Sequence, residues 1–345
     1  MTVERIKRFL RTPVAGPLIT MLLVAVGVAL TTDRFLSRQN LMNVWLQVSI
    51  IAIVAIGATI VILTAQIDLS SGSLVALASV ILAGLIKEMG VPVPLSILLV
   101  IAMGAALGLF NGFFSTYGRI PSFIFTLGTL AIFRGLAFLY TQGAPIFSVS
   151  PQLNPLFYRT FLGMPLPFVY VMVLYAAAWG YLRYTEGGRN IYAVGGNDSA
   201  ARLSGINVNL VRTRAFVIAG FMSGLAGVLL TARLDSGSPN YGQGYELTAI
   251  AAAVIGGASL FGGHGNVFAT LFGALTIVLV QNGLNLHGVP AAWQEIALGA
   301  IIAVAVGVDM WRRDIGQALG RLFGGRPRQE AERPAPTEPP VRTRT

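Results

Sequence analysis

Charged side chains are scarce in this sequence of 345 residues. Only 24 residues are basic and 14 acidic, so charged residues make up 11% of the chain, whereas an ordinary soluble protein carries about 25%. Hydrophobic residue types make up 54%. This composition excludes a soluble enzyme with a single anchor and predicts an all-α polytopic membrane protein.

Cysteine is absent altogether, which rules out disulfides, thiolate nucleophiles, iron–sulfur clusters and zinc–thiolate sites. With only two histidines, His264 and His287, we expect no metal site. A phosphate-binding loop of the GxxxxGK(S/T) type is also missing, because the glycines of GGASLFGGHG at 256–265 come without a lysine. We interpret these glycines as close helix packing and a tight turn.

Crossing a bilayer core about 30 Å thick takes about 20 mostly apolar residues. The sequence predicts ten such segments, at 15–32, 44–64, 72–88, 92–115, 121–141, 164–183, 211–232, 247–262, 266–285 and 293–311. They form a membrane domain at 15–312, between a basic arm at 1–14 and a tail at 313–345. We expect an uncleaved first helix, because no small-x-small site follows Leu30. The tail is rich in Pro, Arg and Glu, so we expect it to be largely disordered.

Basic residues are unevenly divided between the two sides of this arrangement. With the N-terminus inside, eighteen Lys and Arg fall on the inner side and five in the outer loops. Cytoplasmic loops collect Lys and Arg, so the asymmetry favours ten helices with both termini in the cytoplasm. It also explains the net charge of +10 without nucleic acid, and anionic lipid headgroups are the expected neighbours.

An internal repeat joins two distant segments. VILTAQID at 61–68 and VLLTARLD at 228–235 share five of eight residues, and both run on into Ser and Gly. In the ten-helix topology the two copies run in opposite directions across the membrane. Inverted repeats are a common way to build transporters, with the substrate route at the repeat interface. The alternative is chance similarity between apolar stretches.

The polar stretch EGGRNIYAVGGNDSAARLSGINVN at 186–209 follows the sixth segment. Gly195 and Gly196 break the chain, and Asn197 or Asp198 can cap a helix start. A short helix at 199–203 is then expected, stopped by Gly205. With Ala200 and Ala201 on it, such a helix suits insertion into a groove on a partner protein, the alternative being an ordinary amphipathic connector.

Long stretches of the chain carry a family resemblance. They are QIDLSSGSLVAL at 66–77, RIPSFIFTLGTLAIFRGL at 119–136, GRNIYAVGGNDSAARLSGI at 188–206, TARLDSGSPNYGQGYELTAIAAAVIGGASLFGGHG at 231–265 and NGLNLHGV at 282–289. Together they resemble the permease subunits of bacterial ATP-binding-cassette importers, of the ribose-type monosaccharide class. The resemblance extends over about 40–312 and stops before the tail.

This resemblance implies a multi-pass subunit of the bacterial inner membrane that is not itself an enzyme. The short glycine-framed helix corresponds to the coupling helix that contacts the ATPase, carried here by Gly195, Gly196, Asn197, Ala200, Ala201 and Gly205. The implied partners are two cassette ATPase domains, a second permease copy or paralogue (a homodimer is expected) and a periplasmic sugar-binding protein. ATP and Mg are used by the partner ATPase, and no cofactor is bound by this chain.

Polar residues within the apolar segments are candidates for the translocation path. Arg134 lies in the middle of a segment, where a charge costs roughly 2.5–3.5 kcal/mol on insertion scales. It is either a pathway residue or a hydrogen-bond anchor for broken backbone nearby. Asp68 and Asp235 end the two repeat copies and join it as path candidates, although Asp68 can instead cap the next helix. For the uncharged residues near segment ends we favour bonding between helices over sugar contacts: Asn111, Gln281, Asn282 and Asn285.

Other functions remain open at this stage. An ion-coupled secondary transporter needs its own ion site, and the carboxylates fall mainly at segment ends. An integral-membrane enzyme needs a nucleophile and a base together, and no such pair is found. Within the cassette mechanism the cargo could instead be a nucleoside, a polyol, a branched-chain amino acid or a signalling furanose.

Overall fold

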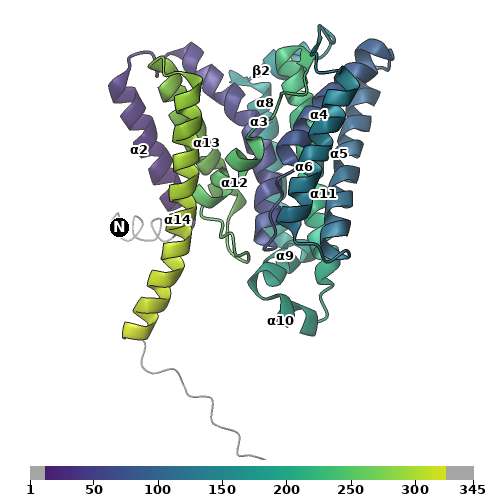
Figure 1. Cartoon of the computed structure of the whole chain (residues 1–345). Coiled ribbons are helices and arrows are strands. Elements are labelled where there is room, and N and C mark those ends of the chain that lie inside the picture. Colours follow the sequence, from purple (N-terminus) through teal and green to yellow (C-terminus); the bar gives the residue numbers. More distant parts are fainter. Residues whose placement is uncertain (1–11, 324–345) are drawn as a thin grey trace, which may run out of the picture.

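The computed structural model describes residues 12–323, so residues 1–11 of the predicted arm and 324–345 of the predicted tail lie outside it. Within this range the protein is a bundle of helices (Figure 1). Its strands are four two-residue pieces: β1 (Ile146–Phe147) pairs antiparallel with β4 (Ser236–Gly237), and β2 (Thr160–Phe161) with β3 (Met164–Pro165). The prediction of an all-α polytopic membrane protein is confirmed.

Among the described residues, eight helices are long and apolar enough to cross a membrane. They are α3 (Arg38–Leu63), α4 with its π-helical end η1 (Ser71–Ala83 and Gly84–Glu88), α5 (Val93–Thr116), α6 (Ser122–Thr141), α8 (Leu166–Tyr184), α11 (Val208–Leu234), α13 (Val267–Leu286) and α14 (Ala291–Phe323). Two shorter apolar helices, α2 (Ala15–Thr31) and α12 (Tyr245–Ile255), bring the total to ten. Each predicted segment therefore contains a helix.

The eighth predicted segment, 247–262, was wrong as a full span. Helix α12 has 11 residues, which is about 16 Å at 1.5 Å per residue, or roughly half of a bilayer core. The preceding chain, 238–244, is not helical because Pro239, Gly242 and Gly244 interrupt it. Gly256 and Gly257 end the helix, and Gly257 has the left-handed φ of +83° that favours glycine.

Helix α3 forms the centre of the bundle. Every residue from Val48 to Thr64 is buried, as expected for a helix that is apolar on all sides. Helices α5, α6 and α14 lie at the periphery and expose large apolar side chains such as Leu98, Leu139 and Val304. In a membrane these outer faces are suited to lipid or to another apolar surface.

Helices α5 and α11 pack closely through glycines. A Cβ atom on Gly104 would lie 2.5 Å from the carbonyl oxygen of Gly220, and one on Gly112 would lie 2.9 Å from the Cα of Thr213. No real Cβ tolerates such contacts, so these two backbones approach each other only because the side chains are missing.

The two repeat copies pack in matching ways. Helix α3 contacts α11, and each of them also contacts the two helices that follow the other: α11 packs on α4 and α5, and α3 packs on α12 and α13. Helix α4 contacts α6, as α12 contacts α14. Helix α3 ends beside α9 (Glu186–Gly196), whereas α11 ends at the β1–β4 pair. The copies are thus antiparallel, which supports the inverted repeat.

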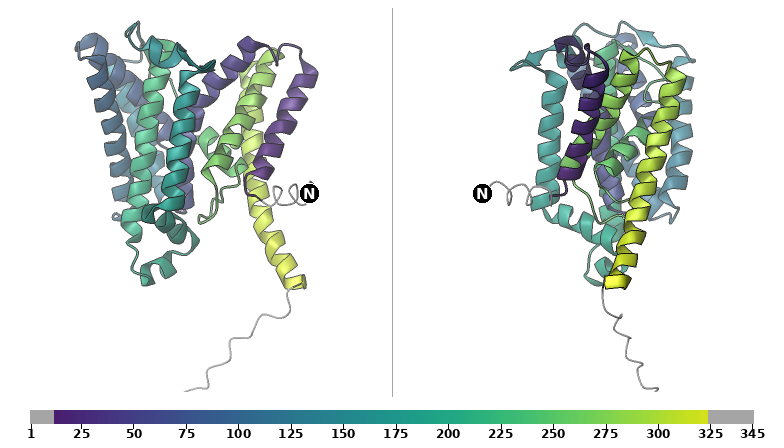
Figure 2. Two further views of the ribbon diagram at one scale, coloured as in Figure 1. Left: turned by 180° about the vertical axis from the view of Figure 1, so that it is seen from behind. Right: turned by 90° about the vertical axis from the view of Figure 1, so that its left-hand side faces the viewer.

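The two ends of the bundle differ in character. One carries α9 and α10 (Asp198–Leu203), and the other carries the small strands and α7 (Asn154–Tyr158) (Figures 1 and 2). We call them the α10 end and the strand end. Helix α14 points its last turns toward the α10 end and continues to Phe323, beyond residue 312 where the sequence placed the end of the membrane domain.

Candidate functional site

The polar stretch that follows α8 folds into two short helices at the α10 end. The hydroxyl of Thr185 caps α9 by accepting from Gly188 N at 3.1 Å. The side chain of Asn197 caps α10, accepting from Ala200 N at 2.9 Å. Gly205, with φ of +81°, follows α10. The predicted cap and the predicted stop are confirmed, but the 11-residue helix α9 before them was missed. Four of its residues are glycines and three more are Glu, Arg and Asn, a composition that resembles a loop.

Three chain segments meet where α9 ends. The backbone N–H of Gly263 donates to the carbonyl of Leu63, the last residue of α3, at 3.0 Å. Gly195 lies against the same carbonyl, and a Cβ added to it would also lie 2.5 Å from Gly263 N. We call this three-way contact of Leu63, Gly195 and Gly263 the glycine junction. It joins α9 to the end of α3 and to the loop that leaves α12.

Tyr192 reinforces this connection from one turn earlier in α9. Its hydroxyl donates to the carbonyl of Gly265 at 3.0 Å. Burial raises the pKa of this phenol, so the hydroxyl stays protonated and remains a donor at neutral pH. Helix α9 is therefore fixed to the 256–266 loop by a side chain as well as by close backbone contact.

The predicted coupling residues divide into buried and exposed ones. Gly195 and Ala201 are buried, so they hold α9 and α10 against the bundle and cannot touch a partner directly. Gly196, Asn197, Ala200 and Gly205 are exposed. Leu203, which the sequence reading did not select, is 90% exposed. A large apolar side chain presented to solvent on a polar helix is typical of a protein contact.

An ionic cluster connects α10 to α11, and sequence reasoning missed it. Asp198 pairs with Arg202 at 2.7 Å and with Arg212 at 3.0 Å. Arg212 is the more buried arginine, with its side chain 18% exposed. The two arginines border a polar cavity of about 510 Å³ that also reaches Gln66 and Arg119. The (i, i+4) spacing of Asp198 and Arg202 was the one available signal.

Asp68 lies in the break between α3 and α4. Its side chain is buried and accepts from the backbone N–H and the hydroxyl of Ser70, at 2.8 and 2.7 Å. Asn111 on α5 donates to the same hydroxyl at 2.7 Å. These bonds hold Ser70 in place just before α4, but no side chain caps the first turn of that helix, so the capping interpretation of Asp68 is not confirmed.

Arg134 on α6 binds the non-helical segment 238–244 between α11 and α12. We call this segment the second break, and the interruption between α3 and α4 the first break. Its guanidinium donates to the backbone carbonyls of Pro239 and Tyr241, the latter at 2.7 Å. Both carbonyls belong to the non-helical 238–244 segment and have left the regular helical ladder. The anchor interpretation of this arginine is therefore confirmed: it supplies donors to backbone that would otherwise be unsatisfied in an apolar setting.

The two breaks meet inside the bundle. Gly72, at the start of α4, is packed against the carbonyl of Gly242 and the carboxylate of Glu246 at the start of α12. One oxygen of Glu246 is buried without a hydrogen bond. Sequence reasoning placed the carboxylates mainly at segment ends and so missed Glu246, because the shortening of α12 that brings it into the interior was not foreseen.

Asp235 is not brought together with Asp68 and Arg134. It ends α11 at the strand end, with a left-handed φ of +45°. Its carboxylate accepts from Ser150 N at 3.1 Å, and its carbonyl from Val149 N at 3.3 Å. These contacts hold the β1 loop on α11.

The preference for bonding between helices is confirmed for three of the amides. Asn282 on α13 exchanges two hydrogen bonds with Asn40 on α3, at 2.9 and 2.8 Å. Asn285 accepts from Gln294 on α14 at 2.8 Å. Asn111 bonds to Ser70, as described above.

Comparison with known proteins shows the family to which this chain is similar. A family profile described as "Branched-chain amino acid transport system / permease component" matches residues 40–306. The ribose import permease protein RbsC of Bacillus subtilis is 42% identical over 85% of this chain and 92% of its own length. That of Escherichia coli K12 is 41% identical over the same shares. The D-allose transport system permease protein AlsC of Escherichia coli K12 is 35% identical over 84% and 89%. No solved structure matches the chain.

Proposed function

Because this chain belongs to the permease family of these transport systems, we propose that it is the membrane-spanning subunit of an ATP-driven importer of monosaccharides. It is a multi-pass membrane protein and a transport subunit. The similar permeases are named for ribose, D-allose and xylose. These names favour a sugar cargo over the branched-chain amino acids in the family description.

The observation that carries the proposal is the glycine junction. A device driven from outside the membrane needs a rigid connection from its docking surface to the parts that move. Helices α9 and α10 offer an exposed polar surface. At the junction α9 touches the end of α3, before the first break, and the loop after α12, which follows the second. A displacement of α9 therefore acts on both breaks together.

We place the α10 end in the cytoplasm of the bacterial inner membrane, because it carries Arg119, Arg183, Arg189 and Arg202. Both termini lie there too. A cassette ATPase docks on α10, uses ATP and Mg, and leaves this chain without a cofactor of its own. A periplasmic sugar-binding protein docks at the strand end. Two copies of the chain, each contributing half of the pore, complete the importer.

The interior suits transient passage of a sugar. Backbone groups and the carboxylate of Glu246 lie at the crossing of the breaks. Arg134 and Asp68 are already engaged in bonds within the protein. Half-helices that start inside the membrane are a recurrent way to build transport routes. Weak, polar contacts let a sugar enter and leave, whereas strong binding there would trap it.

The test is uptake into proteoliposomes that contain this permease, its cassette ATPase and its binding protein. We expect uptake of labelled ribose that requires ATP and stops with a hydrolysis-defective ATPase. A protonophore should leave it unchanged. Uptake that survives the defective ATPase but collapses with the protonophore would show an ion-coupled transporter instead. Uptake of leucine without any sugar would overturn the cargo assignment.

A further inference from the structure

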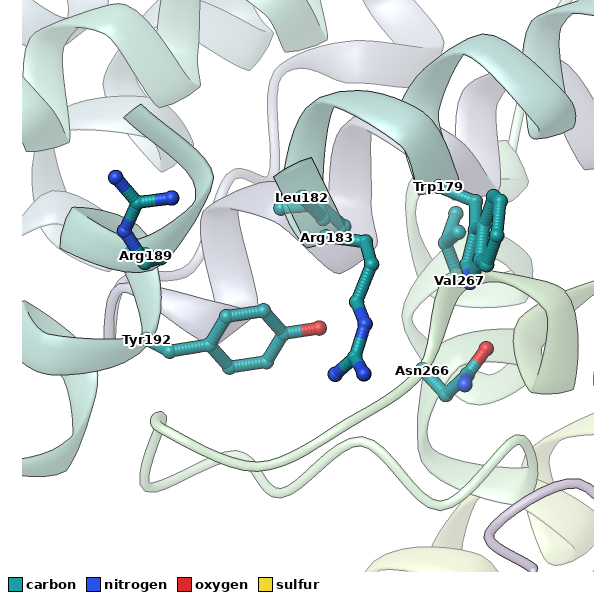
Figure 3. Close-up of a pocket in the computed structure, with 7 residues that line it drawn as sticks. All are labelled: Trp179, Leu182, Arg183, Arg189, Tyr192, Asn266 and Val267. Atoms are coloured by element: carbon teal, nitrogen blue, oxygen red, sulfur yellow. The ribbon is translucent and has the colours of Figure 1, made fainter. Parts of the chain in front are cut away.

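A second basic cavity lies at the α10 end, away from the ionic cluster of Asp198. It has a volume of about 620 Å³ and lies between the last turns of α8, helix α9 and the start of α13. Figure 3 shows the guanidinium of Arg183 between the ring of Tyr192 and Asn266. Arg189 also lines it. The proposed transport mechanism leaves this cavity without a role.

The cavity is positively charged and lacks a counter-charge. No acidic residue lines it, and neither arginine forms an ion pair with any residue between 12 and 323. The one acidic side chain in the adjoining turns is Glu186, which is exposed and outside the lining. Arg189 makes one long bond, to the carbonyl of Tyr184 at 3.4 Å. The guanidinium of Arg183 lies beside Tyr192 and Asn266, whereas that of Arg189 points away from them at the edge of the cavity (Figure 3). Arg183 can therefore bond to the oxygens of an anion, and Arg189 adds positive charge nearby.

The remaining walls are apolar and lie toward the membrane. Trp179, Leu182 and Val267 line the cavity, with Trp179 and Val267 side by side in Figure 3. Trp179 is 37% exposed, and Met172, two turns earlier on the same face of α8, is 40% exposed. Tryptophan is enriched where a membrane meets water. A free inorganic anion gains no favourable contact from this apolar wall, whereas the acyl chain of a lipid can pack along it.

We propose that this cavity binds the phosphate group of an anionic phospholipid, with Arg183 on the phosphate, Arg189 adding positive charge at the edge of the cavity, and the acyl chains along the outer face of α8. Free inorganic phosphate could make the same contacts with the arginines as a lipid headgroup. The exposed apolar path along α8 favours the lipid. Basic pockets between helices on the cytoplasmic side are a known form of lipid recognition. The proposal rests on the membrane orientation given above and is independent of the transported cargo.

The experiment measures lipid retained by the purified full chain, using native mass spectrometry after exchange into phosphatidylglycerol or phosphatidylcholine. Each arginine near a membrane surface contributes about fivefold to the binding of an anionic lipid. We expect phosphatidylglycerol to bind about fivefold more weakly to Arg183→Gln or Arg189→Gln, and about 25-fold more weakly to the double variant. Arg183→Lys keeps the charge and should retain most of the binding.

Arg214→Gln is the matched control, because Arg214 is exposed near the start of α11 and does not line the cavity. It should retain phosphatidylglycerol like the unaltered protein. Equal loss in this control would mean general charge attraction and would overturn the proposal, as would equal retention of phosphatidylcholine. Displacement of the lipid by excess inorganic phosphate would assign the cavity to a soluble anion instead. Transport is not measured, so failure here leaves the proposed function intact.

Discussion

The substitution Gly195→Ala tests the glycine junction most directly, because its neighbour supplies the control. A methyl group at 195 would lie 2.5 Å from Gly263 N and closer still to the carbonyl of Leu63. Both obstacles are backbone, so neither can rotate aside. A methyl group at Gly196 has nothing within 4 Å. The two variants add the same group to adjacent residues of one helix and differ only in what it meets.

The expected cost follows from these contacts. Overpacking a tight site costs about 1–3 kcal/mol, and loss of the bond from Gly263 to Leu63 adds about 1 kcal/mol. Alanine regains about 1 kcal/mol of helix propensity over glycine. The net destabilisation at Gly195 is therefore about 1–3 kcal/mol. Gly196→Ala should be neutral, or more stable by up to about 1 kcal/mol.

The measurements are thermal unfolding of the purified permease and ATP-driven uptake per inserted molecule. Gly195→Ala should lower the unfolding temperature and slow uptake. The rate of uptake falls about tenfold for every 1.4 kcal/mol that the substitution adds to the activation free energy of the coupling step. Gly196→Ala should leave the unfolding temperature unchanged or slightly raised. If Gly195→Ala unfolds and transports like the unaltered protein, α9 is not tied to α3 as described, and the coupling argument fails with it.

Three further predictions follow from other contacts. Arg134→Met should lower uptake more than it lowers the amount of inserted protein, because the carbonyls of Pro239 and Tyr241 lose hydrogen bonds worth about 1.5–3 kcal/mol each. Arg134→Lys should recover part of the lost uptake. Normal uptake per molecule in Arg134→Met would refute the anchor interpretation. Asp198→Asn should weaken ATPase binding in a pull-down by freeing α10 from α11. Asp33→Asn, at an exposed position in the loop between α2 and α3 at the strand end, should not. In this cysteine-free chain, Arg202→Cys should resist an impermeant thiol reagent added to intact cells and Arg233→Cys should react; labelling of position 202 from outside would invert the topology.

The breaks show how far sequence reasoning reaches into the fold. Ten apolar segments were visible because a membrane span leaves a one-dimensional signal of length and hydropathy. The short length of α12 could not be predicted, because the hydropathy of its sequence does not show where the helix ends. Its end depends on the packing of Gly256 against Thr270 of α13. The polar loop at 186–209 was recognised by composition, but α9 within it is held by contacts with distant backbone.

What the sequence alone determined is the class of the protein, its segments, the charge asymmetry of its loops, the inverted repeat and the caps of α10, since all of these depend on neighbouring residues or on counts. Only the tertiary structure decided which hydrogen-bond donors pair with which acceptors, and which backbones come into contact. Arg134 and Pro239 are 105 residues apart, and Leu63, Gly195 and Gly263 come from three separate parts of the chain. Buried backbone groups must find a partner wherever the fold brings one, and no local pattern in the sequence names that partner.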